Sequence, residues 1–196
     1  MTKPNLSLPY YHDVLVAPND TQLHISRGIG EEQIDYLIFY SNTDENVAKY
    51  TNDRERFRNR QSFERWLTKG RIVYTLSGIN DVLLGICWFG EEKIPYRTFL
   101  LPIDPVLYQF TSALRVYNGM RRRGLSTPFF QRCHRDFMEN PAFSQSDYKG
   151  FWAATSVDNI PAIKVLEKLG YSRVTNSNEN NKILMVIDHQ TLLQNV

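Results

Sequence analysis

The stretch MRRRGLSTPFF, Met120 to Phe130, places three arginines before a single glycine and follows them with two hydroxyl residues, a proline and an apolar run. The preceding segment, Phe110–Asn118, contains β-branched and aromatic residues and predicts a strand. Pro128 suits the first turn of a helix, which Ser126 or Thr127 can cap. The sequence therefore predicts a strand, a tight arginine-rich loop and a helix N-terminus in direct succession.

A helix N-terminus that follows a tight loop is suited to binding an anion, because its first N–H groups have no partner inside the helix and its dipole is positive there. Gly124 lets the backbone approach a phosphate without an intervening Cβ. Ser126 and Thr127 supply hydroxyl donors, and an arginine can grip a second phosphate oxygen. These features point to a pyrophosphate cradle, and an ordinary solvated loop is the alternative. The motif is neither a P-loop nor a Rossmann fingerprint.

Composition limits the class of protein. A net charge of +2 is too small to indicate a nucleic-acid binder by itself. Cys87 and Cys133 lie far apart without a Cys-x-x-Cys pattern, which argues against a disulfide framework or a cysteine-rich zinc site. His12, His24 and His189 have no ligand spacing, so no metal site is predicted. His134, in the predicted helix that begins at 126, is expected to face solvent.

The chain shows no apolar segment long enough to span a membrane, and its N-terminus lacks the apolar stretch of a signal peptide. Its 196 residues suit one domain. We therefore expect a soluble, cytoplasmic protein with a single domain over residues 1–196, of which residues 1–20 form an irregular N-terminal segment.

Periodic segments alternate between strand and helix along the chain. Strands are expected at 21–27, 71–90 (a hairpin), 110–118, 150–157 and 171–188 (a second hairpin). Helices are expected at 31–42, 61–70, from 126 to the Glu-Asn-Pro at 139–141, and 158–170. The mixed-charge stretch at 52–60 is expected to be solvated. This order predicts a mixed α/β sheet with helices on its faces.

A second pattern follows the arginine-rich loop. DNIPAIKVLEKLGY, Asp158 to Tyr171, predicts a short helix with Asp158 or Asn159 as N-cap and Gly170 at its C-terminal end. Together, the loop and this helix resemble the GNAT superfamily of acyl-CoA-dependent acyltransferases, whose patterns are Gln/Arg-x-x-Gly-x-Gly/Ala and Asn-x-x-Ala…Gly-Phe/Tyr. The matching positions are Arg121, Gly124 and Ser126 (in place of the usual Gly or Ala), and Asn159, Ala162, Gly170 and Tyr171.

The resemblance implies a GNAT-like fold, a mostly antiparallel twisted sheet flanked by helices on both faces, with acetyl-CoA as co-substrate. The loop would bind the pyrophosphate of CoA through backbone amides, the end of the preceding strand would pair with the pantetheine arm and polarise the acetyl carbonyl, and the second helix start would hold the pantetheine. The residues so implied are Leu114, Val116, Arg121, Arg122, Arg123, Gly124, Leu125, Ser126, Thr127, Asn159 and Ala162.

One position departs from the family pattern. Many members carry a tyrosine four residues before the glycine of the second pattern, where it protonates the leaving thiolate, and this chain has Leu166. Two other residues are therefore candidates for proton transfer. Tyr117 ends the strand that enters the loop, with packing as its alternative role, and Glu91 lies near where the family often keeps a general base, with a polar turn as its alternative.

The predicted function is acetyl transfer from acetyl-CoA to a primary amine, either a protein N-terminus or lysine or a small amine, by direct attack on the thioester. A non-catalytic acyl-CoA-binding or regulatory module is the alternative that Leu166 favours. A nucleic-acid binder using Arg115 and Arg121–Arg123 is a weaker alternative because the net charge is small. No membrane partner is expected, and a homodimer is left open.

Overall fold

The computed structural model describes residues 12–95, 101–117, 119–139, 149–174 and 181–195. Within them, eight strands form a sheet in the order β1-β2-β3-β4-β5-β6-β8-β7. The chain divides into two compact units, Met1–Trp88 with Leu114–Phe129 and Phe89–Ala113 with Phe130–Val196. Three elements contribute residues to both units: β4 (Leu83–Glu91), β5 (Phe110–Val116) and α5 (Ser126–Met138).

In the first unit, antiparallel strands pair through buried apolar residues. The outer strands are β1 (His12–Val16), β2 (Gln22–Arg27) and β3 (Ile72–Ser77). Leu15 lies opposite Leu23, and Ile25 lies opposite Leu76. All four side chains are buried, because alternate residues of a strand point to the same face. A 3₁₀ turn, Ile79–Asp81, joins β3 to β4.

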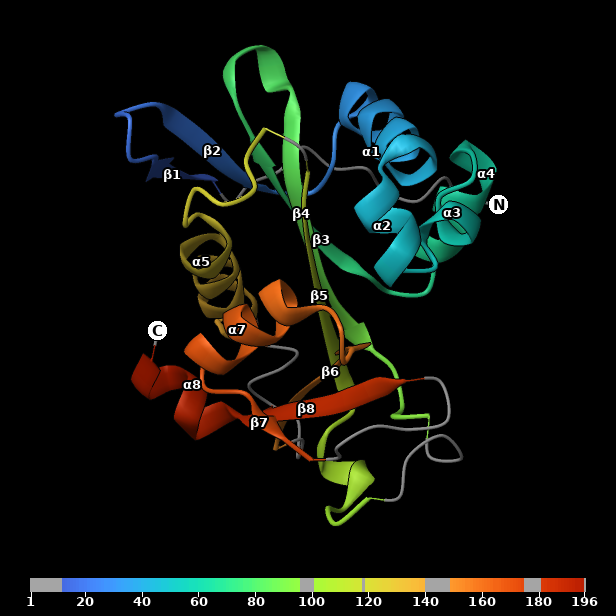
Figure 1. The fold of residues 1–196 in the computed structure, drawn as a ribbon, viewed down its shortest axis with the longest axis vertical. Helices are drawn as coiled ribbons and strands as arrows, with labels where there is room; N and C mark the ends of the chain where they lie inside the picture. The colour runs from blue at the N-terminus through green and yellow to red at the C-terminus, as the bar shows by residue number, and fades with distance from the viewer. Residues whose placement is uncertain (1–11, 96–100, 118, 140–148, 175–180, 196) are drawn as a thin grey trace. The chain divides into compact units, whose positions relative to one another are not determined.

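Four helices of the first unit gather on one side of β3 and β4 (Figure 1). They are α1 (Glu31–Thr43), α2 (Glu45–Tyr50), α3 (Asp53–Arg56) and α4 (Arg60–Leu67). Ile34 and Leu37 of α1 are buried at helical spacing, as the sequence predicts. Asp44 ends α1 and caps α2, because its Oδ1 accepts the backbone N–H groups of residues 46 and 47 at 2.9 and 3.2 Å.

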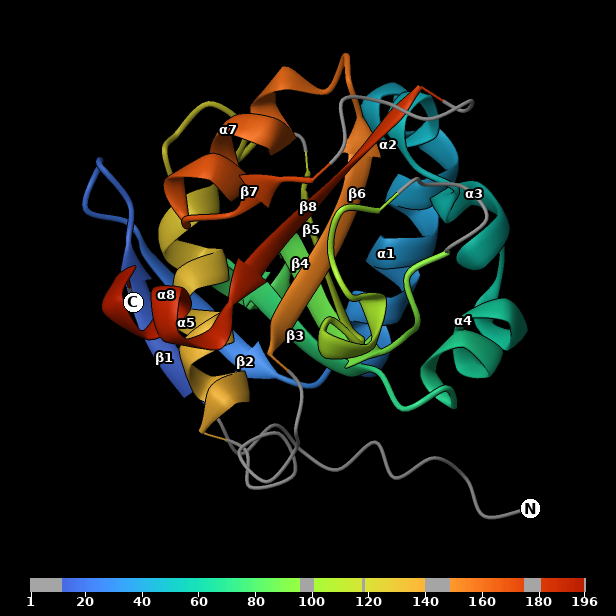
Figure 2. The same ribbon diagram turned by 90° about the horizontal axis from the view of Figure 1, so that it is seen from below.

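The second unit is built on β6 (Gly150–Ser156), which is parallel to β5 and antiparallel to β8 (Lys182–Asp188). The short β7 (Ser172–Arg173) pairs with β8, and α8 (His189–Asn195) follows β8 in the chain (Figure 2). Gly150 is required by close approach, because a Cβ there would lie 1.9 Å from the carbonyl oxygen of Ile187. The remaining elements are α7 (Ile160–Lys168) and a 3₁₀ turn, Pro105–Leu107.

Aromatic rings fill the core of the second unit. The ring centroids of Phe89 and Phe137 lie 4.7 Å apart, and that of Phe151 lies within 6 Å of both. Such stacked and edge-to-face pairs add to the free energy gained by burial. This core fixes α5 against the second unit's strands.

The mixed, mostly antiparallel sheet with flanking helices matches the fold class expected from the sequence. Three local expectations are corrected. His12–Val16 is a strand inside the segment expected to be irregular, and α8 was not predicted. The stretch at 52–60 is not simply solvated, because it contains α3 and because Asp53 and Phe57 are fully buried.

None of the helices in the described part of the chain is long and apolar enough to cross a membrane. Among the described residues, no group of three or more histidine, cysteine, aspartate or glutamate side chains is arranged to hold a metal ion.

Candidate functional site

The loop between β5 and α5 has an unusual backbone. Gly119, Arg122 and Gly124 all have positive φ, at 94°, 64° and 74°. A Cβ on Gly124 would meet no described protein atom within 4 Å, so the space above this glycine is open. Leu125 is buried and anchors the loop, and α5 begins at the next residue, Ser126. The predicted strand, loop and helix N-terminus are therefore confirmed as local structure.

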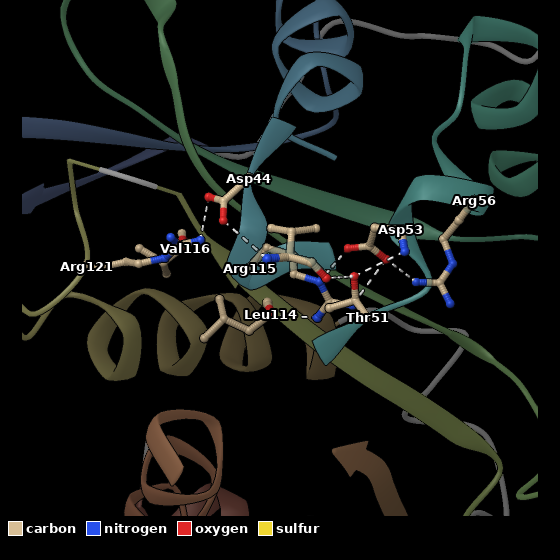
Figure 3. Close-up of polar contacts among 9 residues, drawn as sticks. Asp44, Thr51, Asp53, Arg56, Leu114, Arg115, Val116 and Arg121 are labelled. Carbon is tan, nitrogen blue, oxygen red and sulfur yellow. Dashed lines mark hydrogen bonds and ion pairs between the residues drawn. The ribbon is translucent and has the colours of Figure 1, made fainter. Parts of the chain in front are cut away.

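The three arginines of the loop differ from one another. Arg122 and Arg123 are exposed. Arg121 instead points back toward the protein: its Nε donates to the carbonyl of Val116 at 3.0 Å, and a terminal nitrogen donates to Oδ2 of Asp44 at 2.6 Å (Figure 3). The run of like charges is therefore split between one paired arginine and two that face solvent.

A second arginine, Arg115, is held in a similar way. It donates to both carboxylate oxygens of Asp53, at 2.6 and 3.3 Å, and to the carbonyl of Leu114 at 2.8 Å (Figure 3). Its guanidinium also lies 4.9 Å from the centre of the Trp88 ring. Arg115 thus faces the protein, which removes it from the basic surface that a nucleic-acid binder would need.

Asp53 is fully buried and ionised. Burial alone would raise the pKa of this carboxyl, but the guanidinium of Arg115, assisted by Arg56 at 2.6 Å, outweighs burial and lowers its pKa. The backbone N–H of Asp53 also donates to the hydroxyl of Thr51 at 3.1 Å. Two Arg–Asp pairs therefore join the end of β5 and the following loop to the starts of α2 and α3.

Tyr117 follows β5 and is fully buried. Its ring stacks on Tyr40 with centroids 4.5 Å apart, and its backbone N–H donates to Leu84 at 2.9 Å. The hydroxyl has no hydrogen-bond partner among the described residues. Burial, followed by the charge of Asp53, raises the pKa of this phenol far above its usual value. Tyr117 therefore keeps its proton and cannot serve as a general base.

The predicted residues Glu91, Asn159 and Ala162, and the departing position Leu166, lie in the second unit. Asn159 is the N-cap of α7, where its Oδ1 accepts from the backbone N–H of Ala162 at 3.4 Å. Leu166 is buried, and its carbonyl accepts from the backbone N–H of Tyr171 at 3.0 Å, which closes the helix beyond Gly170. Glu91 is exposed at the last position of β4.

A buried polar chain in the second unit was missed by sequence reasoning, which placed His134 on a solvent-facing helix surface. That placement is wrong, because His134 is fully buried. Its Nδ1 lies 2.8 Å from the carbonyl of Phe130, its Nε2 lies 2.8 Å from the Tyr171 hydroxyl, and that hydroxyl lies 2.7 Å from Oγ of Ser112.

The directions of these hydrogen bonds follow from the carbonyl, which can only accept. Nδ1 of His134 therefore carries the proton, Tyr171 donates to Nε2, and Ser112 donates to Tyr171. Burial lowers the pKa of His134 to about 3, so the imidazole is neutral. A neutral imidazole whose N–H is already donated to a backbone carbonyl is a poor acid. We therefore assign the chain to holding β5, α5 and the end of α7 together.

The second unit also contains a pocket of about 300 Å³. It lies where α7 ends, around Gly170, and Asp188 is among its lining residues. Asp188 is held by the hydroxyl of Tyr108 at 2.7 Å and by Lys149 at 3.5 Å. Because Asn159 opens α7 and Gly170 follows its other end, this pocket is not the predicted cofactor site.

No protein-family model and no curated protein sequence matches this chain. Solved structures do match it. An uncharacterised protein from Bacillus halodurans superposes with a TM-score of 0.66 at 14% identity, over 95% of each chain. The GNAT domain of S. lividans PAT gives 0.65 at 12% identity, over 90% of this chain and 96% of that one.

The aminoglycoside acetyltransferase AAC(6')-Ib, solved in complex with coenzyme A, gives a TM-score of 0.62 at 14% identity, over 88% of this chain and 98% of that one. These likenesses show that the chain has the GNAT fold, which the two sequence patterns predicted.

Proposed function

Because the chain has the GNAT fold, we propose that it is an N-acetyltransferase that moves the acetyl group of acetyl-CoA to a primary amine. The loop between β5 and α5 carries this proposal. Its backbone has positive φ at three positions, the space above Gly124 is open, and two arginines face solvent beside a helix N-terminus. A phosphate group fits that combination of free N–H groups and positive charge.

The loop binds the pyrophosphate of CoA, with Gly124, Leu125 and Ser126 supplying backbone N–H groups and Arg122 and Arg123 supplying charge. The assignments of Thr127 to the same group, and of Asn159 and Ala162 to the pantetheine arm, stay predictions. Cytoplasmic localisation and a homodimer also stay predictions.

The chemistry needs little from the side chains. The lone pair of the amine attacks the thioester carbon, the C–N bond forms, the C–S bond breaks, and CoA leaves as a thiolate. One proton passes overall from nitrogen to sulfur. The backbone N–H groups at Leu114 to Val116 are assigned to the developing oxyanion, and much of the rate enhancement comes from positioning.

The proton to the thiolate has no obvious donor. Leu166 has no proton to give, and its side chain is buried. Tyr117 stays protonated, but its hydroxyl is buried and exposes no surface to a bound ligand, so its role in proton transfer stays a prediction. Glu91 is retained as a candidate base because it is exposed. A non-catalytic CoA-binding module remains the second candidate function, favoured by Leu166.

Release of the CoA thiol, followed with a thiol reagent, tests the proposal. Acetyl-CoA is supplied with three acceptors: a peptide with a free N-terminus, a peptide whose only amine is lysine, and a small primary amine. We expect at least one acceptor to give thiol release with one acetyl group gained per thiol. CoA binding without release for an extended acceptor panel supports the module, and no binding of CoA contradicts both functions.

A further inference from the structure

Arg121 stands at the first position of the loop pattern, but its side chain is committed within the first unit. We propose that Asp44 and Arg121 form a positioning pair that holds the phosphate-binding loop in its binding-ready shape and ties it to α2. Arg121 then acts through the loop backbone and does not contact the phosphate. The inference rests on the proposed function in that it takes CoA as the ligand of the loop.

The bonds of Arg121 hold its guanidinium against the protein. Nε is used by the carbonyl of Val116, and a terminal nitrogen is used by Asp44 at 2.6 Å, the short distance of a charge-assisted bond. The Asp44 side chain is almost completely buried at 7% exposure, and the Arg121 side chain is 30% exposed. A phosphate that drew the guanidinium away from Asp44 would leave a buried carboxylate unpaired, which is unfavourable.

Asp44 is itself fixed on both oxygens. Oδ1 accepts from two backbone N–H groups of the first turn of α2, and Oδ2 accepts from Arg121. Rotating the carboxylate away would break the N-cap of α2 as well as the ion pair. One side chain therefore connects the start of α2 to the loop, and Arg121 carries that connection on to the end of β5.

The loop also needs external support, because its backbone is strained. Arg122, next to Arg121, has a positive φ, a conformation that is unfavourable for a non-glycine residue. Contacts around a residue keep such a conformation populated. The two bonds of Arg121 are well placed to do so, because they anchor the residue immediately before the strained one.

The two possible roles of Arg121 predict opposite effects of Asp44→Asn on CoA affinity, measured by isothermal titration calorimetry with CoA. If the pair positions the loop, Asp44→Asn and Arg121→Ala each weaken binding by about tenfold, as expected for loss of a charge-assisted bond, and the double variant is no weaker than either. The salt dependence of binding also stays at the wild-type slope in Arg121→Ala, because no phosphate contact is lost.

Tighter CoA binding by Asp44→Asn overturns the proposal, because Asp44 would then compete with the phosphate for Arg121. Additive losses in the double variant, or a flatter salt dependence in Arg121→Ala, also overturn it. Asp35→Asn is the matched control, because Asp35 lies on α1 and the variant removes its carboxylate from an exposed ion pair with Arg60 of α4. That variant should bind CoA like the wild type.

Hydrogen–deuterium exchange of the free protein separates this inference from the proposed function. Asp44→Asn should speed exchange in the peptide covering residues 119–126 while leaving the β1–β2 peptide unchanged, as local rather than global loosening requires. If the wild type fails to bind CoA, the proposed function falls, and exchange alone decides whether the pair holds the loop. Equal exchange rates of the loop in wild type and variant overturn the proposal that the pair holds the loop.

Discussion

Two polar networks hold β5, and they are built from different chemistry. In the first unit, Arg115 and the loop residue Arg121 pair with Asp53 and Asp44 through charge-assisted bonds at 2.6 Å. In the second unit, Ser112 is held by the neutral chain that runs through Tyr171 to His134. One strand is thus fixed by ions in one half and by neutral groups in the other.

The difference follows from burial. Ser112 and His134 are at most 3% exposed, and ions placed there would lose their hydration without compensation. The arginines remain 19% and 30% exposed, so they keep part of their hydration while neutralising buried carboxylates. The neutral network stabilises the fold. The charged network can form only at the solvent-accessible end of β5, beside the loop where an anionic ligand is proposed to bind.

The charged network should give the largest effect on stability. Arg115→Met leaves Asp53 buried with only Arg56 as cationic partner, and we expect a loss of about 3–5 kcal/mol in the free energy of unfolding. Arg60→Met removes the exposed pairs with Glu31 and Asp35 and should cost less than about 1 kcal/mol. Urea unfolding measures both. Equal losses would show that the charged network is no more than a surface feature.

The neutral network should give the next largest effect. Tyr171→Phe keeps the ring but leaves Nε2 of His134 without a donor; because the Ser112 hydroxyl can rotate, we expect a loss of about 1–3 kcal/mol in the free energy of unfolding. Tyr108→Phe is the matched control, because Tyr108 bonds to the half-exposed Asp188, which can take a water instead. A Tyr171→Phe variant as stable as the wild type would mean that the chain adds nothing to the fold.

The pH dependence of stability should separate the two networks. His134 has a pKa of about 3 in the folded protein, against the ordinary value of 6.5, so the unfolded chain binds more protons between these values and stability falls as pH falls. The free energy of unfolding changes by about 1.4 kcal/mol per pH unit from this residue between pH 6 and pH 4. The contribution of Asp53, whose pKa is lowered from 3.8, is lost only at lower pH.

Urea unfolding at pH 4, 5, 6 and 7 tests this, with His134→Gln as the comparison. The free energy of unfolding of the wild type should fall steeply across this range. That of the variant should fall less steeply, and the difference in slope should correspond to the binding of about one proton. Parallel curves for the two proteins would show that His134 does not titrate across this interval on unfolding.

Signals within a few residues of each other could be read from the sequence. Asn159 and Gly170 predicted the ends of α7, and the loop glycine with the following hydroxyls predicted the start of α5. Each depends on backbone geometry within one or two turns, which local residue types determine. The order of such elements was then enough for the fold class.

The polar networks could not be read in this way, because their partners lie far apart in the chain. Asp53 meets Arg115 across 62 residues, and His134 meets Tyr171 across 37. In sequence, Asp53 belongs to a charged stretch typical of a solvated surface, and His134 is followed by an arginine and an aspartate. The one local signal was Asp44, whose place before ENVAKY is typical of an N-cap.

The central claim is that the backbone of the loop between β5 and α5 binds CoA, and calorimetry with CoA on three proteins tests it most directly. We predict binding by the wild type, a loss of about tenfold or more in Gly124→Val, whose positive φ disfavours a β-branched residue, and a smaller loss in Arg122→Ala. Circular dichroism confirms that each variant is folded. No binding by the folded wild type, or a larger loss in Arg122→Ala than in Gly124→Val, would contradict the account.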